Sequence, residues 1–257
     1  MTEVKLGQVD PATAGDGIAS FGVNPWRDWA ARAALIIIYG GSAVLGAMGI
    51  PHLLPLDSFH GLLMAAAHMA NVLFLGLVAV TTVTRLVPIM KSKGIETRLS
   101  ALLGTFLSVV LAFLPKAELD PIWSILSTAL ILVATSLCIV VLRWLGKSFS
   151  ILAEARRLVT EGPYRIVRHP LYLCEMLALV GVTLQVLSPL AVLIAIAVVA
   201  IQCRRMFNEE RILRLAFPEY DAYAARTPFL IPARLIPAGI GRWAHQLFAR
   251  AFRADGS

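Results

Sequence analysis

The chain has 257 residues, of which 58% are hydrophobic and only 15% are charged. An ordinary soluble domain carries about 25% charged residues, so the composition excludes a conventional water-soluble globule and excludes disorder over most of the chain. An integral membrane protein remains. The three cysteines, Cys138, Cys174 and Cys203, lie in or at the ends of apolar stretches. Their spacing indicates neither disulfides nor zinc, and no metal site is predicted.

Five stretches lack Asp, Glu, Lys and Arg, and each is near or above the roughly 20 residues that a helix needs to cross a bilayer. They are residues 33–56, 58–84, 99–115, 121–142 and 176–203. The last is long for one crossing, and Ser188-Pro189 in its middle favours two helices joined by a tight turn. Two crossings require this segment to run from Pro170 to about Phe207. We therefore predict an all-α bundle of about six transmembrane helices.

The basic residues predict the orientation of this bundle. With six crossings, all 23 Lys and Arg residues except Lys116 fall on one face. The positive-inside rule puts that face in the cytosol, together with both termini and the loops at 85–98 and 143–169. In a bacterium the membrane would be the inner one. Basic residues that face an anionic leaflet also explain the net charge of +7, so no nucleic-acid partner is predicted.

Two chemically dense segments flank the predicted hairpin. In the first, Gly162-Pro163 indicates a turn and His169-Pro170 a helix start, which gathers Arg168, His169 and Tyr172 at the mouth of a helix. These residues either form a site or anchor the helix end in the lipid headgroups. The second segment, 204–223, returns to the same membrane face. The two segments should therefore meet around one cytosolic pocket.

The order of motifs in these segments resembles that of a known superfamily. The motifs are Gly162-Pro163-Tyr164, Arg168-His169-Pro170-Leu171-Tyr172, the hairpin, Glu209-Glu210 and Phe217-Pro218-Glu219-Tyr220. Together they resemble the integral-membrane methyltransferases of the isoprenylcysteine carboxyl methyltransferase and phospholipid methyltransferase superfamily, over about residues 143–232. One departure is Cys174, where the family commonly has Gly. We expect its larger side chain to narrow the entrance for the cofactor.

The resemblance implies S-adenosyl-L-methionine as the methyl donor and a lipophilic small molecule or lipidated substrate as the acceptor, on the cytosolic face. Its expected cofactor contacts are Leu158, Val159, Tyr164, His169, Pro170, Leu171, Tyr172 and Glu209. Arg205 is implied as a substrate contact. The residues alone allow another interpretation, because Arg205 and Glu209 are four apart and can form a helical ion pair. Nothing in the sequence selects oxygen, nitrogen or sulfur as the methylated atom.

Polar residues inside the predicted helices are costly to bury and need an explanation. Glu175 either lines the substrate entrance, where it can act as a base, or forms a structural ion pair with Arg204 or Arg205. His68 and Asn71 share a face of one predicted helix, and we expect them, like Gln185, to make hydrogen bonds between helices.

The predicted regions are a mobile N-terminal segment with an interfacial approach at 1–32, a four-helix transmembrane region at 33–142, the methyltransferase-like catalytic region at 143–232 and a basic tail at 233–257. Two other functions remain open. Related membrane folds use NADPH to reduce sterol-like double bonds, and a transporter or scaffold could keep the motif as a helix anchor. The oligomeric state is not predicted.

Overall fold

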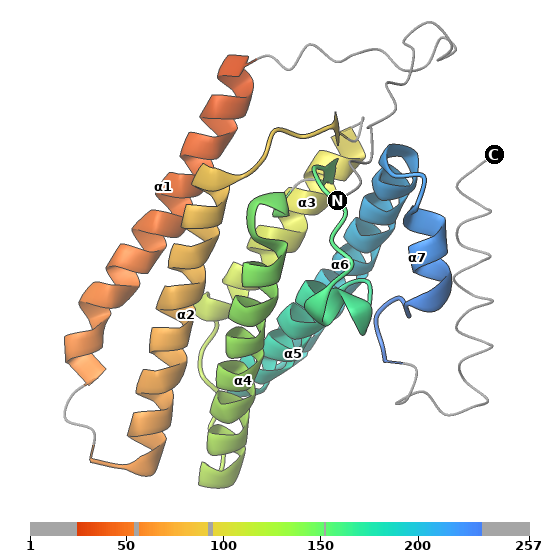
Figure 1. The fold of residues 1–257 in the computed structure, drawn as a ribbon. Coiled ribbons are helices and arrows are strands. Elements are labelled where there is room, and N and C mark those ends of the chain that lie inside the picture. Colours follow the sequence, from red (N-terminus) through yellow and green to blue (C-terminus); the bar gives the residue numbers. More distant parts are fainter. Residues whose placement is uncertain (1–24, 54–56, 92–94, 152, 233–257) are drawn as a thin grey trace, which may run out of the picture.

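The structure, a computed structural model, describes residues 25–53, 57–91, 95–151 and 153–232. Its α-helices are α1 Pro25–Gly49, α2 Phe59–Thr84, α3 Ile95–Phe106, α4 Pro121–Leu145, α5 Pro170–Gln185, α6 Pro189–Ala216 and α7 Tyr220–Arg226. The 3-10 helices are η1 Ile50–Leu53, η2 Leu107–Phe113, η3 Gly146–Ser148 and η4 Gly162–Arg165. Two short strands, β1 Met90–Lys91 and β2 Glu154–Ala155, pair antiparallel. The predicted all-α bundle is confirmed (Figure 1).

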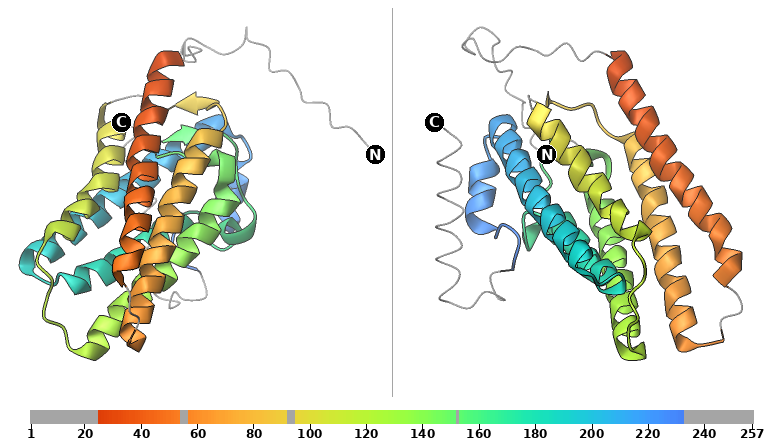
Figure 2. Two further views of the ribbon diagram at one scale, coloured as in Figure 1. Left: turned by 90° about the vertical axis from the view of Figure 1, so that its left-hand side faces the viewer. Right: turned by 180° about the vertical axis from the view of Figure 1, so that it is seen from behind.

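The helices from α1 to α6 alternate in direction along the bundle, as the six predicted spans require (Figures 1 and 2). Among the described residues, four helical segments are long and apolar enough to cross a membrane: Arg32–Leu53, Phe59–Thr84, Pro121–Ser148 and Pro189–Ala216. The other two are shorter. Helix α3 tightens into the 3-10 helix η2, and α5 has 16 residues. The number of helices that cross the bilayer therefore stays a prediction.

The predicted hairpin is formed by α5 and α6. Helix α5 ends at Gln185, and α6 begins at Pro189, where the missing proline N–H is not needed. The Ser188 side chain caps α6 by accepting from the Ala191 N–H at 3.1 Å. Helix α6 runs to Ala216, well past the predicted end near Phe207. The second dense segment therefore continues this helix as far as Ala216, and its last residues begin α7 at Tyr220.

The two loops that were predicted to be cytosolic lie at the same end of the bundle and are joined by backbone hydrogen bonds. The Leu86 N–H donates to the Lys147 carbonyl at 2.9 Å, and the Ile89 N–H donates to the Ala155 carbonyl at 2.7 Å. The antiparallel β1–β2 pair adds further backbone hydrogen bonds between the two loops. The far end of α6 and the whole of α7 also lie here (Figure 1). Much of the two chemically dense segments therefore lies at one end of the bundle.

Close helix packing shapes the middle of the bundle. One buried cluster joins α2, α4 and α5 with the loop before α5, and includes Val78, Cys138, Leu142, Tyr164, Leu171 and Cys174. Gly181 lets α5 approach α4, because a Cβ there would lie 2.7 Å from the Ile131 side chain and 3.0 Å from the Ser127 carbonyl oxygen. Large apolar side chains such as Leu45, Leu73 and Leu193 stay exposed on the outer faces. An apolar outer surface of this kind suits contact with lipid.

The ends of the chain are described only in part. Helix α1 begins at Pro25, so residues 25–32, which were predicted as an interfacial approach, are already helical. The rest of the predicted N-terminal segment, 1–24, lies outside the described residues. The same is true of the predicted basic tail at 233–257.

Candidate functional site

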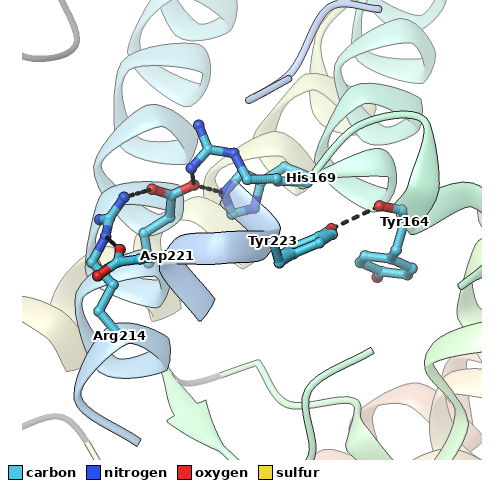
Figure 3. Close-up of polar contacts among 7 residues, drawn as sticks. Tyr164, His169, Arg214, Asp221 and Tyr223 are labelled. Atoms are coloured by element: carbon cyan, nitrogen blue, oxygen red, sulfur yellow. Dashed lines mark hydrogen bonds and ion pairs between the residues drawn. The ribbon is translucent and has the colours of Figure 1, made fainter. Parts of the chain in front are cut away.

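The two dense segments meet at the buried carboxylate of Glu210 (Figure 3). Its Oε1 atom lies 2.6 Å from Arg168 Nη1 and 3.3 Å from His169 Nε2, and its Oε2 atom lies 3.0 Å from Arg214 Nη2. The Glu210 side chain is 0% exposed. Arg214 also contacts Asp221 of α7 at 3.0 Å. The cluster therefore ties the start of α5 to α6 and α7.

His169 is buried at the start of α5 and packs against neighbouring rings. Its residue is 3% exposed, and its ring packs against Phe229 and Tyr172, with centroids 4.8 and 5.6 Å away. The backbone N–H of Arg168 donates to the Pro228 carbonyl at 2.8 Å, and that of His169 donates to the Phe229 carbonyl at 3.2 Å. The segment after α7 thus clamps the start of α5.

Tyr164 is fixed by α7 from the other side. The Tyr223 hydroxyl donates to the Tyr164 backbone carbonyl at 2.7 Å (Figure 3). Tyr164 belongs to η4, and the positive φ of 59° at Gly162 confirms the predicted turn. Burial, with a smaller contribution from the Glu209 carboxylate, raises the pKa of the Tyr164 phenol well above its usual value. The hydroxyl therefore keeps its proton at neutral pH and can donate a hydrogen bond.

A cavity of about 500 Å³ opens beside these elements, within the roughly 300–1,000 Å³ usual for small-molecule sites. Its wall contains most of the predicted site residues: Tyr164, His169, Leu171, Tyr172, Glu175, Arg205 and Glu209. Leu158, Val159 and Pro170 lie outside the wall as the structure describes it. Val159 packs instead against the buried cluster that includes Tyr164, and Pro170 is buried as the first residue of α5. Gln202 and Ile151 join the wall although the sequence did not suggest them.

Gln202 links the two residues that were predicted to be catalytic. Its Nε2 atom donates to Glu175 Oε2 at 2.8 Å, and its Oε1 atom accepts from Arg205 Nη1 at 2.8 Å. Arg205 also donates to the Ile151 carbonyl at 3.2 Å, and its guanidinium lies over the Tyr172 ring, 5.3 Å from the centroid. The three polar side chains from α5 and α6 therefore act as one unit.

Both ion-pair alternatives raised by the sequence are wrong for the described residues. Arg205 bonds to Gln202 and Ile151 and makes no ion pair with Glu209. Glu175 bonds to Gln202, while Arg204 turns outward to Glu96 of α3 at 3.0 Å. The i,i+4 ion pair on this helix is instead the one between Glu210 and Arg214. That spacing was visible in the sequence and could have revealed the structural role of Glu210.

Helix α3 contributes to the site through the absence of a side chain. Gly104 lines the cavity, and a Cβ added there would lie 2.7 Å from Arg205 Cδ and 3.1 Å from Ile201 Cγ2. The glycine therefore makes room for the stem of Arg205. No sequence pattern indicated this role.

Three other expectations can be compared with the structure. Cys174 sits in the buried cluster with Cys138 and is not part of the cavity wall, so its side chain does not narrow this cavity. The interhelical hydrogen bonds are confirmed for His68 and Gln185, whereas Asn71 makes none among the described residues. His68 Nε2 lies 2.8 Å from the Gly46 carbonyl oxygen, and Gln185 Nε2 donates to Thr128 Oγ1 at 3.2 Å.

Comparison with known proteins identifies the region that holds most of this site. Residues 122–219 match the phospholipid methyltransferase family. The match confirms the predicted resemblance of this part of the chain to the membrane methyltransferase superfamily. The match begins with α4, earlier than the predicted start at 143, and ends before α7. Protein-S-isoprenylcysteine O-methyltransferase B of Arabidopsis thaliana is 36% identical over 94 residues, which cover 34% of this chain and 48% of that protein.

Two bacterial relatives carry names of a different kind. The cobalt-zinc-cadmium resistance protein CzcN of Cupriavidus metallidurans is 38% identical over 91 residues, covering 34% of this chain and 40% of the relative. The nickel-cobalt-cadmium resistance protein NccN of Alcaligenes xylosoxydans xylosoxydans is 39% identical over 80 residues, covering 31% of this chain and 38% of the relative. The chain thus spans about two fifths to half of the length of these relatives. Among the described residues, no group of three or more His, Cys, Asp or Glu side chains is placed to hold a metal ion.

Proposed function

We propose that this chain is an integral-membrane methyltransferase that uses S-adenosylmethionine and acts on a lipophilic acceptor at the cytosolic face. One observation carries the proposal: in a chain whose residues 122–219 match a methyltransferase family, a single cavity joins a polar end to an apolar part between the helices. The polar end holds Tyr172, Glu175, Gln202, Arg205 and Glu209, and the apolar part includes Phe74, Leu75, Val78, Leu111 and Leu179. An acceptor dissolved in the bilayer suits such a cavity.

The residues at the polar end fit the proposed cofactor. Glu209 is a carboxylate on the cavity wall, and it makes no ion pair among the described residues. It can accept hydrogen bonds from ribose hydroxyls or from an ammonium group. Tyr164 and Tyr172 offer aromatic surface to a sulfonium cation and to an adenine ring. We therefore assign Glu209, Tyr164, Tyr172 and Leu171 to the cofactor, with His169 as a support for Tyr172.

The remaining polar groups suit the acceptor. Bound at this end, S-adenosylmethionine would supply a methyl group, which leaves the sulfonium sulfur as the acceptor atom bonds to it, and S-adenosylhomocysteine is the second product. Arg205 would anchor a polar part of the acceptor through its planar fork of donors. Glu175 would take the proton that a neutral acceptor loses. The apolar wall would exclude water from the reacting atoms.

A binding experiment tests the cofactor. We expect S-adenosylhomocysteine, and not NADPH, to raise the melting temperature of the detergent-purified protein, because only a ligand that binds the native state stabilises it. Stabilisation by NADPH alone would contradict the proposal and favour a reductase.

A labelling experiment then identifies the acceptor. Cells with and without this chain are fed methionine carrying an isotopic methyl label, and their lipids and small thiols are compared by mass spectrometry. A labelled lipophilic compound that requires the chain supports the proposal. The proposal also assigns Arg205 to the acceptor. Arg205→Lys should therefore lower the amount of the labelled compound, while the affinity of the protein for S-adenosylhomocysteine stays nearly unchanged.

A further inference from the structure

The cavity wall contains polar side chains that lie deeper in the bundle than the residues assigned to the cofactor and the acceptor. Asn71 of α2 and Thr135 of α4 both line its wall. Neither makes a hydrogen bond within the part of the chain that the structure describes. Elsewhere in the bundle, polar side chains such as His68 and Gln185 are satisfied by neighbouring helices. Thr135 is buried, whereas Asn71 is exposed at the side of α2. A polar group that stays unpaired at membrane depth is costly, so Asn71 and Thr135 need a partner from outside the protein.

The two side chains lie at about the same depth. Ser124 Oγ lies 3.2 Å from His60 Nε2, which sets the level of α4 against α2. Both helices run in the same direction from this contact (Figure 1). Asn71 follows His60 at the same interval at which Thr135 follows Ser124. The two groups therefore reach the cavity together and can bind one ligand group between them.

This pair lies deeper in the bundle than the polar end of the cavity. Helix α5 runs antiparallel to α4, and the bond from Gln185 to Thr128 places Ala178, another wall residue, opposite Thr135. Glu175 lies about one helical turn from Ala178, and Tyr172 lies nearly two turns away. At a rise of 1.5 Å per residue, the pair is roughly 5–9 Å deeper than these two residues.

We propose that Asn71 and Thr135 form a subsite for the carbonyl group of a long-chain lipid ligand. The Asn71 amide and the Thr135 hydroxyl both donate hydrogen bonds, and a carbonyl oxygen has two lone pairs to accept them. Apolar wall residues at neighbouring positions, such as Phe74, Val78 and Leu179, contact the hydrocarbon chain. The identity of this ligand as the methyl acceptor rests on the proposed function. The subsite itself rests only on the two unpaired groups and their place in the cavity.

Binding of two matched probes tests the subsite without any turnover. The probes are dodecyl acetate and dodecyl ethyl ether, which differ by a CH₂ in place of the carbonyl group. We expect the purified protein, with no cofactor added, to bind the acetate about tenfold more tightly than the ether, the scale of two net hydrogen bonds. Asn71→Leu and Thr135→Val should each reduce this preference to about threefold, the double variant should abolish it, and all three should leave binding of the ether unchanged.

A matched variant controls for the loss of a hydroxyl. Thr84 of α2 bonds to the Val80 carbonyl at 3.0 Å, and it is not part of the cavity wall. Thr84→Val should keep the full preference for the acetate.

Three outcomes would overturn the subsite. The first is equal binding of the two probes by the unaltered protein, and the second is a preference that survives in the variant with both substitutions. The third is a change of oligomeric mass in Asn71→Leu, measured by light scattering, without a change in preference, because Asn71 would then belong to a contact between copies of the chain. Since no methyl transfer is measured, failure of the proposed enzyme activity would leave this result untouched.

Discussion

Glu209 and Glu210 are neighbours in the chain, yet their carboxylates lie in different surroundings. Glu210 is fully buried against Arg168, His169 and Arg214, whereas Glu209 lines the cavity. Successive residues of a helix point about 100° apart, so one position turns toward the α5 and α7 contacts and the next toward the site. The paired glutamates thus combine a structural residue with a candidate binding residue, and substitutions should separate the two.

Glu210→Gln should destabilise the protein by about 3 kcal/mol, because it leaves the buried partners of this carboxylate without their counter-charge. Thermal unfolding in detergent measures the effect. Asp221→Asn is the control, since Asp221 also pairs with Arg214 but its side chain is 78% exposed. That variant should change stability by less than about 1 kcal/mol. Equal effects of the two substitutions would contradict the structural role of Glu210.

Glu209→Gln should affect cofactor binding and not the stability of the protein. It should weaken binding of S-adenosylhomocysteine by about 1–3 kcal/mol, as expected for the loss of a charge-assisted hydrogen bond, and leave the melting temperature of the free protein nearly unchanged. Isothermal calorimetry and thermal unfolding on one preparation give both values. An unchanged affinity would remove Glu209 from the cofactor site.

Gln202→Leu should lower turnover, because Glu175 and Arg205 lose the side chain that bridges them. We expect the affinity for S-adenosylhomocysteine to change little and kcat to fall more than KM rises, since the acceptor can still enter the cavity. Gln185→Leu is the matched control, as it removes an interhelical hydrogen bond to Thr128 from a residue that is not part of the cavity wall. If both variants lose the same activity, the effect is one of bundle stability and the positioning role is wrong.

Gly104→Ala should disturb the site from α3. The added methyl group would meet the stem of Arg205 at 2.7 Å, so the guanidinium must shift away from Gln202 and Ile151. We expect lower turnover together with a loss of stability of about 1–3 kcal/mol, the usual scale of overpacking. Gly76→Ala in α2 is the comparison, because nothing lies within 4 Å of its added Cβ. That variant should be neutral or more stable by up to about 1 kcal/mol, as measured by thermal unfolding.

The sequence by itself determined the class of the fold and the region of the site. Long apolar stretches indicate helices because an unpaired backbone group is costly in lipid, and the helix satisfies its own backbone. Ser188 and Pro189 located the turn of the hairpin, since one caps a helix and the other fits its first position. The Arg168-His169-Pro170 string and the later glutamates located the candidate site, and they lie inside the segment that matches the methyltransferase family.

Only the tertiary structure decided what each side chain does. Helical spacing shows which residues share a face, but the partner of that face depends on how the helices cross and rotate against one another. The sequence could therefore pair Arg205 with Glu209, whereas in the structure Arg205 bonds to Gln202 on the same helix, and Gln202 in turn bonds to Glu175 of α5. The packing of α3 on α6 brings Gly104 from outside the matched region against Arg205, and the packing of α2 on α4 sets Asn71 level with Thr135. The contacts of Glu175 with Gln202 and of Gly104 with Arg205 join residues far apart in the chain, and no local pattern encodes them.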